Sequence, residues 1–139
     1  MIVDETTDFG ARAAAHLRDD IVVWLTTISG KSGPLPMPVW FVWDGAETVL
    51  MFSQDGARVR NLAADPRVSL NFAGNGRGGD IVVLSGRATV EPDAPPADRV
   101  DAYVEKYREH IARIGLTPEQ FGVKYSNPVR IELTRLRGH

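Results

Sequence analysis

Residues 35–66 read LPMPVWFVWDGAETVLMFSQDGARVRNLAADP, and this stretch decides the fold. Its first half is apolar on both sides of Asp44-Gly45, a dipeptide typical of hairpin turns because glycine accepts a positive φ at little cost. The pattern therefore predicts two antiparallel strands, at 35–43 and 47–53. Both faces of the first strand are apolar, so we expect both faces to be covered.

The alternation of side chains stops after Ser53, where a short helix is predicted. Asp55 is placed to cap this helix, which runs through Val59 and Leu62. Pro66 discourages its continuation. The sequence thus predicts a corner at which a strand ends and a helix begins.

Groups that favour an anion gather at this corner. A hydroxyl, the free amides of the helix start and two guanidinium groups converge there, and each of them can hold a phosphate. Arg58 and Asn61 lie three residues apart on one helical face, whereas Arg60 points elsewhere and would serve a dimer or a longer anionic tail. The alternative is an ordinary helix start with solvent-facing arginines.

The rest of the chain alternates strand and helix signals in a mostly hairpin order. A break is expected at Gly86, where a bulge or bend would interrupt the strand. A closed barrel removes the exposed edges of such a sheet, so we predict a mainly β protein, a six-stranded antiparallel split β-barrel with small helices. Beyond the hairpin and its helix, the predicted helices lie at 7–18, with Thr7 or Asp8 as the cap, from Asp93 to Gly115 and from Thr117, and the predicted strands at 21–28, 68–72, 80–91 and 128–136. The helix that opens at Asp93 carries an apolar stripe, formed by Val100, Tyr103, Val104, Tyr107, Ile111 and Ile114.

Bulk properties bound the possible functions. The chain of 139 residues is predicted to form one domain, 1–139, and its net charge of −2 gives no reason to expect nucleic acid. No cysteine is present, which excludes disulfides and thiol catalysis. An acidic N-terminus and the absence of a long apolar run predict a cytoplasmic protein without a membrane span. Arginine outnumbers lysine 13 to 3, a bias that hints at a GC-rich, actinobacterial genome.

Several patterns point to chemistry that we do not expect here. Residues 74–79 read GNGRGG and match G-x-G-x-x-G, but a strand is predicted on each side, so this is a hairpin loop. His16, His110 and His139 have no partner at a metal-ligand spacing, and solvated or capping roles are expected for them. No serine lies in a nucleophile-elbow pattern. The sequence therefore predicts no metal site and no catalytic side chain.

The order of these features resembles a known family. P-M-P-V-W-F-V, a D-G hairpin, A-R-V-R-N-L-x-x-D-P-R-V-S-L and V-V-L-S-G-R-A-T-V follow one another as in the pyridoxamine 5′-phosphate oxidase-like split β-barrel superfamily. The resemblance covers residues 8–136 and is greatest to its small actinobacterial branch of F420-dependent enzymes. It implies a homodimer that binds FMN or the deazaflavin coenzyme F420 in a cleft between subunits.

The resemblance also implies roles for individual residues. Arg58 stands where many relatives have lysine, which keeps the charge but changes the geometry. The ending TRLRGH lacks the substrate-binding segment of true pyridoxamine phosphate oxidases, so vitamin B6 oxidation is not expected. The residues implied along the ring are Met37, Pro38, Val39 and Trp40, and those implied at the phosphate are Ser53, Gln54, Arg58 and Asn61, with Arg60 nearby.

Three functional hypotheses follow from the resemblance. The first is an oxidoreductase that transfers a hydride from reduced F420 to a small electron-poor organic substrate; because the cofactor carries the chemistry, no acid–base constellation is required. The second is an FMN-binding oxidase or electron carrier with the same fold. The third is a binding or carrier protein for F420 without turnover.

Overall fold

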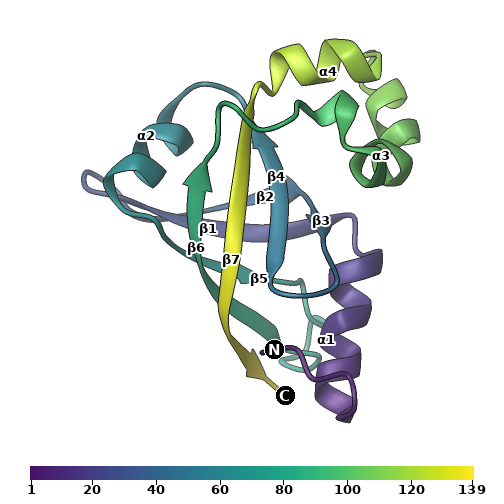
Figure 1. Ribbon diagram of the computed structural model, residues 1–139. Helices are drawn as coiled ribbons and strands as arrows, with labels where there is room; N and C mark the ends of the chain where they lie inside the picture. Colours follow the sequence, from purple (N-terminus) through teal and green to yellow (C-terminus); the bar gives the residue numbers. More distant parts are fainter.

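Backbone hydrogen bonds join seven strands into one antiparallel sheet, in the order β2-β1-β5-β6-β7-β4-β3. The computed structural model describes residues 1–139 and shows this sheet strongly curved, with helices at both of its ends (Figure 1). The strands are β1 (Val22–Ser29), β2 (Gly33–Trp40), β3 (Val42–Trp43), β4 (Thr48–Ser53), β5 (Arg67–Asn71), β6 (Val82–Val90) and β7 (Asn127–Gly138).

A break at Phe41 explains why the structure has seven strands where the sequence predicted six. The predicted strand 35–43 is divided into β2, which pairs with β1, and β3, which pairs with β4. This one stretch of chain therefore lies at both ends of the sheet order and brings the sheet round into a barrel. The predicted antiparallel barrel is confirmed, with one of its six strands interrupted.

The interruption has a defined hydrogen-bonding partner. Phe41 is fully buried, and its N–H donates to the hydroxyl of Tyr107 over 2.8 Å instead of to a strand. The hydroxyl proton of Tyr107 is shared between the carbonyl oxygens of Ile21 and Phe41, at 2.7 and 2.8 Å. A side chain thus satisfies backbone groups that the sheet leaves unpaired.

The helices occur where the sequence predicted them, with one exception. The helix predicted to open at Asp93 begins only at Asp101, because Pro96 is extended and leads into a 3₁₀ turn at Ala97–Arg99. Thr7 caps the first helix and Thr117 begins the last, as expected from the sequence, and Thr117 forms a capping box with Gln120. None of the helices has both the length and the apolar character needed to cross a membrane. The helical segments are α1 (Asp8–Asp19), α2 (Ala57–Ala64), a 3₁₀ turn (Ala97–Arg99), α3 (Asp101–Arg113) and α4 (Pro118–Lys124).

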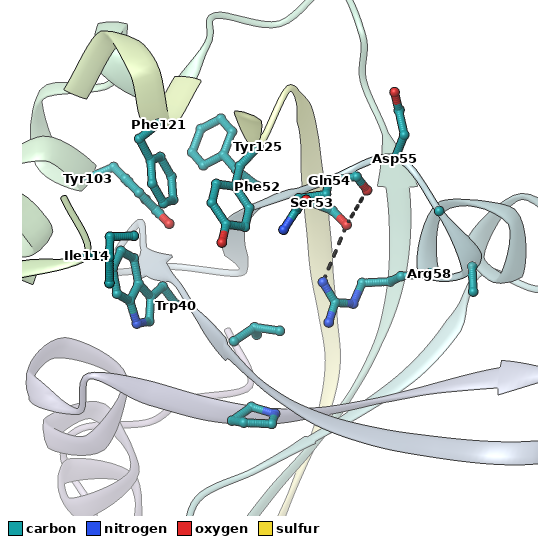
Figure 2. Close-up of a pocket in the computed structure, with 14 residues that line it drawn as sticks. Trp40, Phe52, Ser53, Gln54, Asp55, Arg58, Tyr103, Ile114, Phe121 and Tyr125 are labelled. Atoms are coloured by element: carbon teal, nitrogen blue, oxygen red, sulfur yellow. Dashed lines mark hydrogen bonds between the residues drawn. The ribbon is translucent and has the colours of Figure 1, made fainter. Parts of the chain in front are cut away.

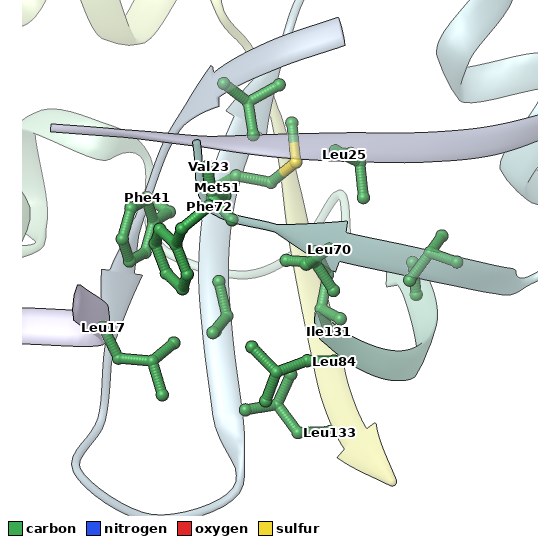
Figure 3. Packing of buried hydrophobic residues seen from close by; sticks show 14 of the residues in the cluster. Leu17, Val23, Leu25, Phe41, Met51, Leu70, Phe72, Leu84, Ile131 and Leu133 are labelled. Carbon is green, nitrogen blue, oxygen red and sulfur yellow. The ribbon is translucent and has the colours of Figure 1, made fainter. Parts of the chain in front are cut away.

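Two hydrophobic clusters stabilise the structure. The larger one fills the barrel with side chains from every strand but β3 and from α1, among them Leu17, Leu25, Met51, Leu84 and Ile131 (Figure 3). The smaller one joins α3 and α4 to the outside of β4 through Phe52, Tyr103, Tyr107, Ile111 and Phe121. The predicted apolar stripe of the helix at 101–113 therefore faces the sheet.

The bulge expected at Gly86 is present, because the register between β6 and β7 shifts between Ser85 and Gly86. A Cβ atom at Gly86 would lie 2.8 Å from the carbonyl oxygen of Glu132, so the close approach of the two strands requires glycine. The glycine-rich segment 74–79 connects antiparallel β5 and β6, which confirms a hairpin loop and excludes the dinucleotide motif.

The prediction that both faces of the strand at 35–43 are covered is wrong for a single copy of the chain. Leu35 and Met37 on β2 are exposed, Met37 to 53%, and Trp24 on the neighbouring strand β1 is 38% exposed. Because β2 lies at one end of the sheet order, no other strand of the chain covers this region.

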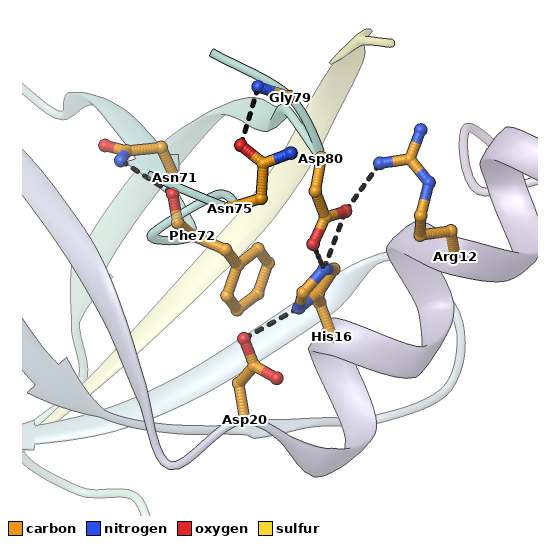
Figure 4. A network of polar contacts seen from close by, with 8 residues as sticks. All are labelled: Arg12, His16, Asp20, Asn71, Phe72, Asn75, Gly79 and Asp80. Carbon is orange, nitrogen blue, oxygen red and sulfur yellow. Dashed lines mark hydrogen bonds and ion pairs between the residues drawn. The ribbon is translucent and has the colours of Figure 1, made fainter. Parts of the chain in front are cut away.

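His16 lies in an ionic network rather than in solvent, which corrects the expectation for this histidine (Figure 4). Its Nδ1 is 2.7 Å from Asp20, and its Nε2 is 2.9 Å from Asp80. Arg12 donates to the same Asp80 carboxylate over 2.6 Å, and the ring stacks on Phe72. The network connects α1 to the end of the β5–β6 loop.

Removal of the Tyr107 hydroxyl is expected to destabilise the fold. The substitution Tyr107→Phe keeps the ring but leaves the buried N–H of Phe41 without an acceptor, which costs about 1–3 kcal/mol. Urea unfolding at one fixed protein concentration measures this loss. Tyr125→Phe, which removes the same group from a half-buried ring, serves as the control, and equal stability of the two variants would contradict the role of Tyr107.

The stabilising effect of His16 is expected to depend on pH. Burial alone would lower the pKa of His16, but the hydrogen bonds and charges of Asp20 and Asp80 outweigh it, and the net pKa is raised. Because the folded-state pKa is raised, the network stabilises the fold when the pH lies below the unfolded-state pKa of about 6.5. This stabilisation is lost as the pH rises through the folded-state pKa.

The stability difference between the natural protein and His16→Gln should therefore be largest near pH 6 and should shrink toward pH 9. Chemical unfolding at several pH values measures it, with His139→Gln, at an exposed chain end, as the control. A difference that grows with pH would contradict the assignment.

Candidate functional site

The principal cavity has a volume of about 600 Å³ and lies between the β2–β4 end of the barrel, the start of α2 and the α3–α4 pair (Figure 2). Polar groups gather at one end and aromatic side chains at the other. The lining residues are Pro38, Val39, Trp40, Phe52, Ser53, Gln54, Asp55, Gly56, Ala57, Arg58, Tyr103, Ile114, Phe121 and Tyr125.

Ser53 and Arg58 form the polar end. Ser53 is the last residue of β4 and is only 1% exposed, and its hydroxyl donates to the carbonyl oxygen of Gln54 over 3.0 Å. The guanidinium Nη1 of Arg58 reaches the same hydroxyl oxygen at 3.4 Å, a long contact (Figure 2). The strand end and the first turn of α2 thus direct two donor groups to one place.

The predicted cap of the following helix is wrong by one residue. Gly56, with φ 147°, is the N-cap of α2 and supplies no side chain, whereas the carboxylate of Asp55 accepts from the side-chain amide of Asn127 over 2.7 Å. Asn127 also donates to the carbonyl oxygen of Ser53. The contact with β7 therefore turns Asp55 away from the helix, and the first-turn amides of 57–59 lack a side-chain acceptor.

The charge of Arg58 has no partner in the chain. No carboxylate forms a salt bridge with it, and its side chain is half-buried. Burial lowers the pKa of Arg58, an effect partly opposed by the nearby Tyr125, but a guanidinium remains protonated in proteins. A cation that is withdrawn from water without a counter-charge favours binding of an anion.

The aromatic end is built mainly by α3, α4 and the end of β2. Trp40 stacks on Phe121 with centroids 5.6 Å apart, and Phe121 stacks on Tyr125 at 4.4 Å. Tyr103 packs beside Phe121 at 5.8 Å. This end is suited to bury a ring-shaped apolar group.

The cavity contains six of the nine residues that the sequence proposed for a cofactor. Met37 points to the opposite face of β2 from Pro38, as alternation along a strand requires. Arg60 is exposed, and Asn61 lies on α2 outside the cavity lining. The six residues that line it are Pro38, Val39, Trp40, Ser53, Gln54 and Arg58.

The aromatic contributors from the C-terminal half were missed. Tyr103 and Ile114 were recognised only as part of an apolar helical stripe, which typically packs in a core. Phe121 and Tyr125 carried no separate signal, since local sequence does not indicate against which end of the barrel a helix pair packs.

Comparison with solved structures shows the same fold. A conserved hypothetical protein, Rv2991, from Mycobacterium tuberculosis aligns with a TM-score of 0.67 and 25% identity over 91% of this chain and 81% of that one. An F420 reductase aligns with a TM-score of 0.65 and 18% identity over 88% and 94%. An FAD-binding protein from Mesorhizobium loti aligns with a TM-score of 0.59 and 20% identity over 84% and 82%.

At the level of sequence, one family matches, and it covers almost the whole chain. No curated protein sequence matches. The family profile described as pyridoxamine 5′-phosphate oxidase matches residues 9–137, which include every strand but the last residue of β7 and the whole cavity lining. The resemblance stated from the motifs is confirmed, and the chain belongs to the pyridoxamine 5′-phosphate oxidase family.

Proposed function

We propose that the protein is an oxidoreductase that binds a flavin-type cofactor, coenzyme F420, in the principal cavity. In this proposal the reduced cofactor supplies a hydride to a small electron-poor organic substrate. Membership of the family and the shared fold of an F420 reductase and an FAD-binding protein support a flavin-type cofactor.

The observation that carries the proposal is the unpaired, half-buried guanidinium of Arg58. It lies beside the Ser53 hydroxyl and at the start of α2, whose first-turn amides have no side-chain cap. Charged and neutral N–H donors together with a hydroxyl are the groups that hold a phosphate. Gln54 adds an amide at the same end, so the donor set fits the phosphate of F420 or FMN.

The other residues predicted from the sequence would contact different parts of the cofactor in this proposal. Pro38, Val39 and Trp40 would lie along the ring system, with Met37 at its margin. Arg60 is exposed on α2 and would face the anionic tail of F420 outside the cavity, and Asn61 would support the start of the helix. No side chain is assigned as a catalytic acid, since solvent can supply the one proton that the substrate takes up together with the hydride.

FMN is the alternative cofactor, supported by the likeness to the FAD-binding protein. The polar end fits the phosphate of either molecule, so the tail distinguishes them: F420 extends beyond its phosphate and FMN does not. A carrier of F420 without turnover would show tight binding but no reductase activity over a broad panel of substrates.

We further propose that the protein acts as a homodimer whose interface completes the cavity. The exposed Trp24 lies opposite Pro38 in the pairing of β1 with β2, and Val22 lies opposite Trp40. Because Pro38 and Trp40 line the cavity, the exposed apolar face of β1 and β2 continues directly from it. A second copy of the chain placed on this face would cover both the exposed apolar residues and the cavity.

Cofactor binding and its dependence on Arg58 test the proposal. A fluorescence titration is expected to show tighter binding of F420 than of FMN. Arg58→Ala should weaken binding about 10- to 100-fold, the effect of a lost charge-assisted hydrogen bond. Arg60→Ala, the matched control on the exposed side of α2, should weaken F420 binding less and leave FMN binding unchanged.

Each outcome of this titration has a consequence. Preference for FMN would favour the alternative function, an FMN-binding oxidase or electron carrier. Unchanged affinity of the Arg58 variant would remove that residue from the site. Binding of neither cofactor would contradict the proposed function.

Substitution of Trp24 tests the homodimer. Trp24→Glu buries a charge in the proposed interface, so a monomer is expected in sedimentation velocity, together with loss of cofactor affinity. Val123→Glu makes a like change at an apolar residue of α4 that is 80% exposed, and it should leave the dimer intact. A natural protein that is monomeric at micromolar concentration would refute the interface.

A further inference from the structure

Asp55 is the one carboxylate among the residues that line the principal cavity. It precedes Arg58 by three residues and lines the same polar end, where a negative charge opposes the binding of a phosphate. Figure 2 shows its side chain directed away from the Arg58 guanidinium. The carboxylate instead accepts a hydrogen bond from the side chain of Asn127 over 2.7 Å.

Asn127 is placed to hold both the strand end and this carboxylate. It is the first residue of β7, is half-buried and lies opposite Ser53 in the pairing of β4 with β7. Its Nδ2 donates to the carbonyl oxygen of Ser53 over 3.2 Å and to the Oδ1 of Asp55 over 2.7 Å. The two acceptors use both hydrogens of the amide nitrogen, and a hydroxyl or a carboxylate at 127 could not supply both bonds.

Release of Asp55 would bring its carboxylate to the groups that the proposed function assigns to the phosphate. Aspartate before a helix is among the preferred acceptors for first-turn amides, and those of α2 have no side-chain cap. A negative charge is also favoured at a helix N-terminus. The half-buried guanidinium of Arg58 offers a counter-charge at the same place. Asp55 is therefore an internal competitor for the phosphate.

We propose that Asn127 is a positioning residue that keeps the anion corner open by holding the Asp55 carboxylate away from it. The anion corner consists of Ser53, Arg58 and the amides of 57–59. This inference rests on the proposed function and deepens it, because it adds a competition between a carboxylate of the chain and the cofactor phosphate. Asn127 is not among the cavity-lining residues, so it acts through Asp55.

Fluorescence titration with FMN and riboflavin tests the proposal, because these two ligands differ only in the phosphate. Asn127→Ala is expected to weaken FMN binding about tenfold, the effect of a competing helix cap, and to leave riboflavin binding unchanged. In protein that also carries Asp55→Ala, the substitution Asn127→Ala should cause no further weakening, since no carboxylate remains to compete. Asn75→Ala, in the β5–β6 loop outside the cavity lining, is the control and should keep the natural FMN affinity.

The double variant separates this role from a purely structural one. It lacks Asn127 as well, so its full FMN binding would show that the site survives the substitution. Equal weakening by Asn127→Ala with and without Asp55 would mean that Asn127 supports the site by another route, and the proposal would be overturned. An unchanged FMN affinity of Asn127→Ala, or equal losses for FMN and riboflavin, would overturn it as well.

Amide resonances of the free protein provide a test that needs no cofactor. In ¹⁵N-labelled protein, Asn127→Ala should move the proton resonances of the amides of 57–59 downfield as Asp55 caps α2. The same substitution in Asp55→Ala protein should not. Absence of this difference would overturn the proposal whatever binds. Failure of both F420 and FMN to bind the natural protein would contradict the proposed function, while the resonances would still decide whether Asn127 controls Asp55.

Discussion

The hydrogen bonds between the Tyr107 hydroxyl and the backbone at Phe41 are the constraint on which the rest of the structure depends. They pair the backbone N–H and C=O of Phe41, the residue at which the strand breaks. Because of this break, β2 pairs with β1 and β3 pairs with β4. The same bonds fix α3 against the barrel. Lys106 precedes Tyr107 on α3, and its Nζ donates a hydrogen bond to the carbonyl oxygen of Phe41 over 3.1 Å. The same Nζ lies 3.9 Å from the centre of the Phe41 ring. The same contacts therefore support both the closure of the barrel and the position of α3, and the cavity lies between these parts.

The cavity collects polar groups that have no partner within the chain. Arg58 is a half-buried cation without a counter-charge, and α2 begins without a side-chain cap. By contrast, His16 outside the cavity is paired with both Asp20 and Asp80. Departures from local stability that gather in one place are typical of a binding site, where the ligand supplies the missing interactions.

The two ends of the cavity separate two tasks. Donor groups at the strand-to-helix corner suit an anion, while the stacked rings of Trp40, Phe121 and Tyr125 suit an apolar ring. The adjoining face of β1 and β2 is apolar and uncovered within the chain, and prolines along β2 remove donors from its edge. A flavin-type cofactor held by its phosphate, a substrate against the rings and a second subunit over the mouth are mutually compatible on this arrangement.

The sequence by itself determined the elements, the barrel and one half of the site. Hairpin and capping signals are local, so the turn at Asp44-Gly45, the bulge at Gly86 and the corner between Ser53 and Arg58 could be predicted from residues close together in the chain. Only the tertiary structure decided the break at Phe41 and the true start of α2. Each depends on a side chain more than sixty residues away, Tyr107 in one case and Asn127 in the other. The aromatic half of the site was out of reach for the same reason: an apolar stripe predicts that a helix packs, but only the three-dimensional contacts decide which surface it packs against and which of its side chains remain free to meet a ligand.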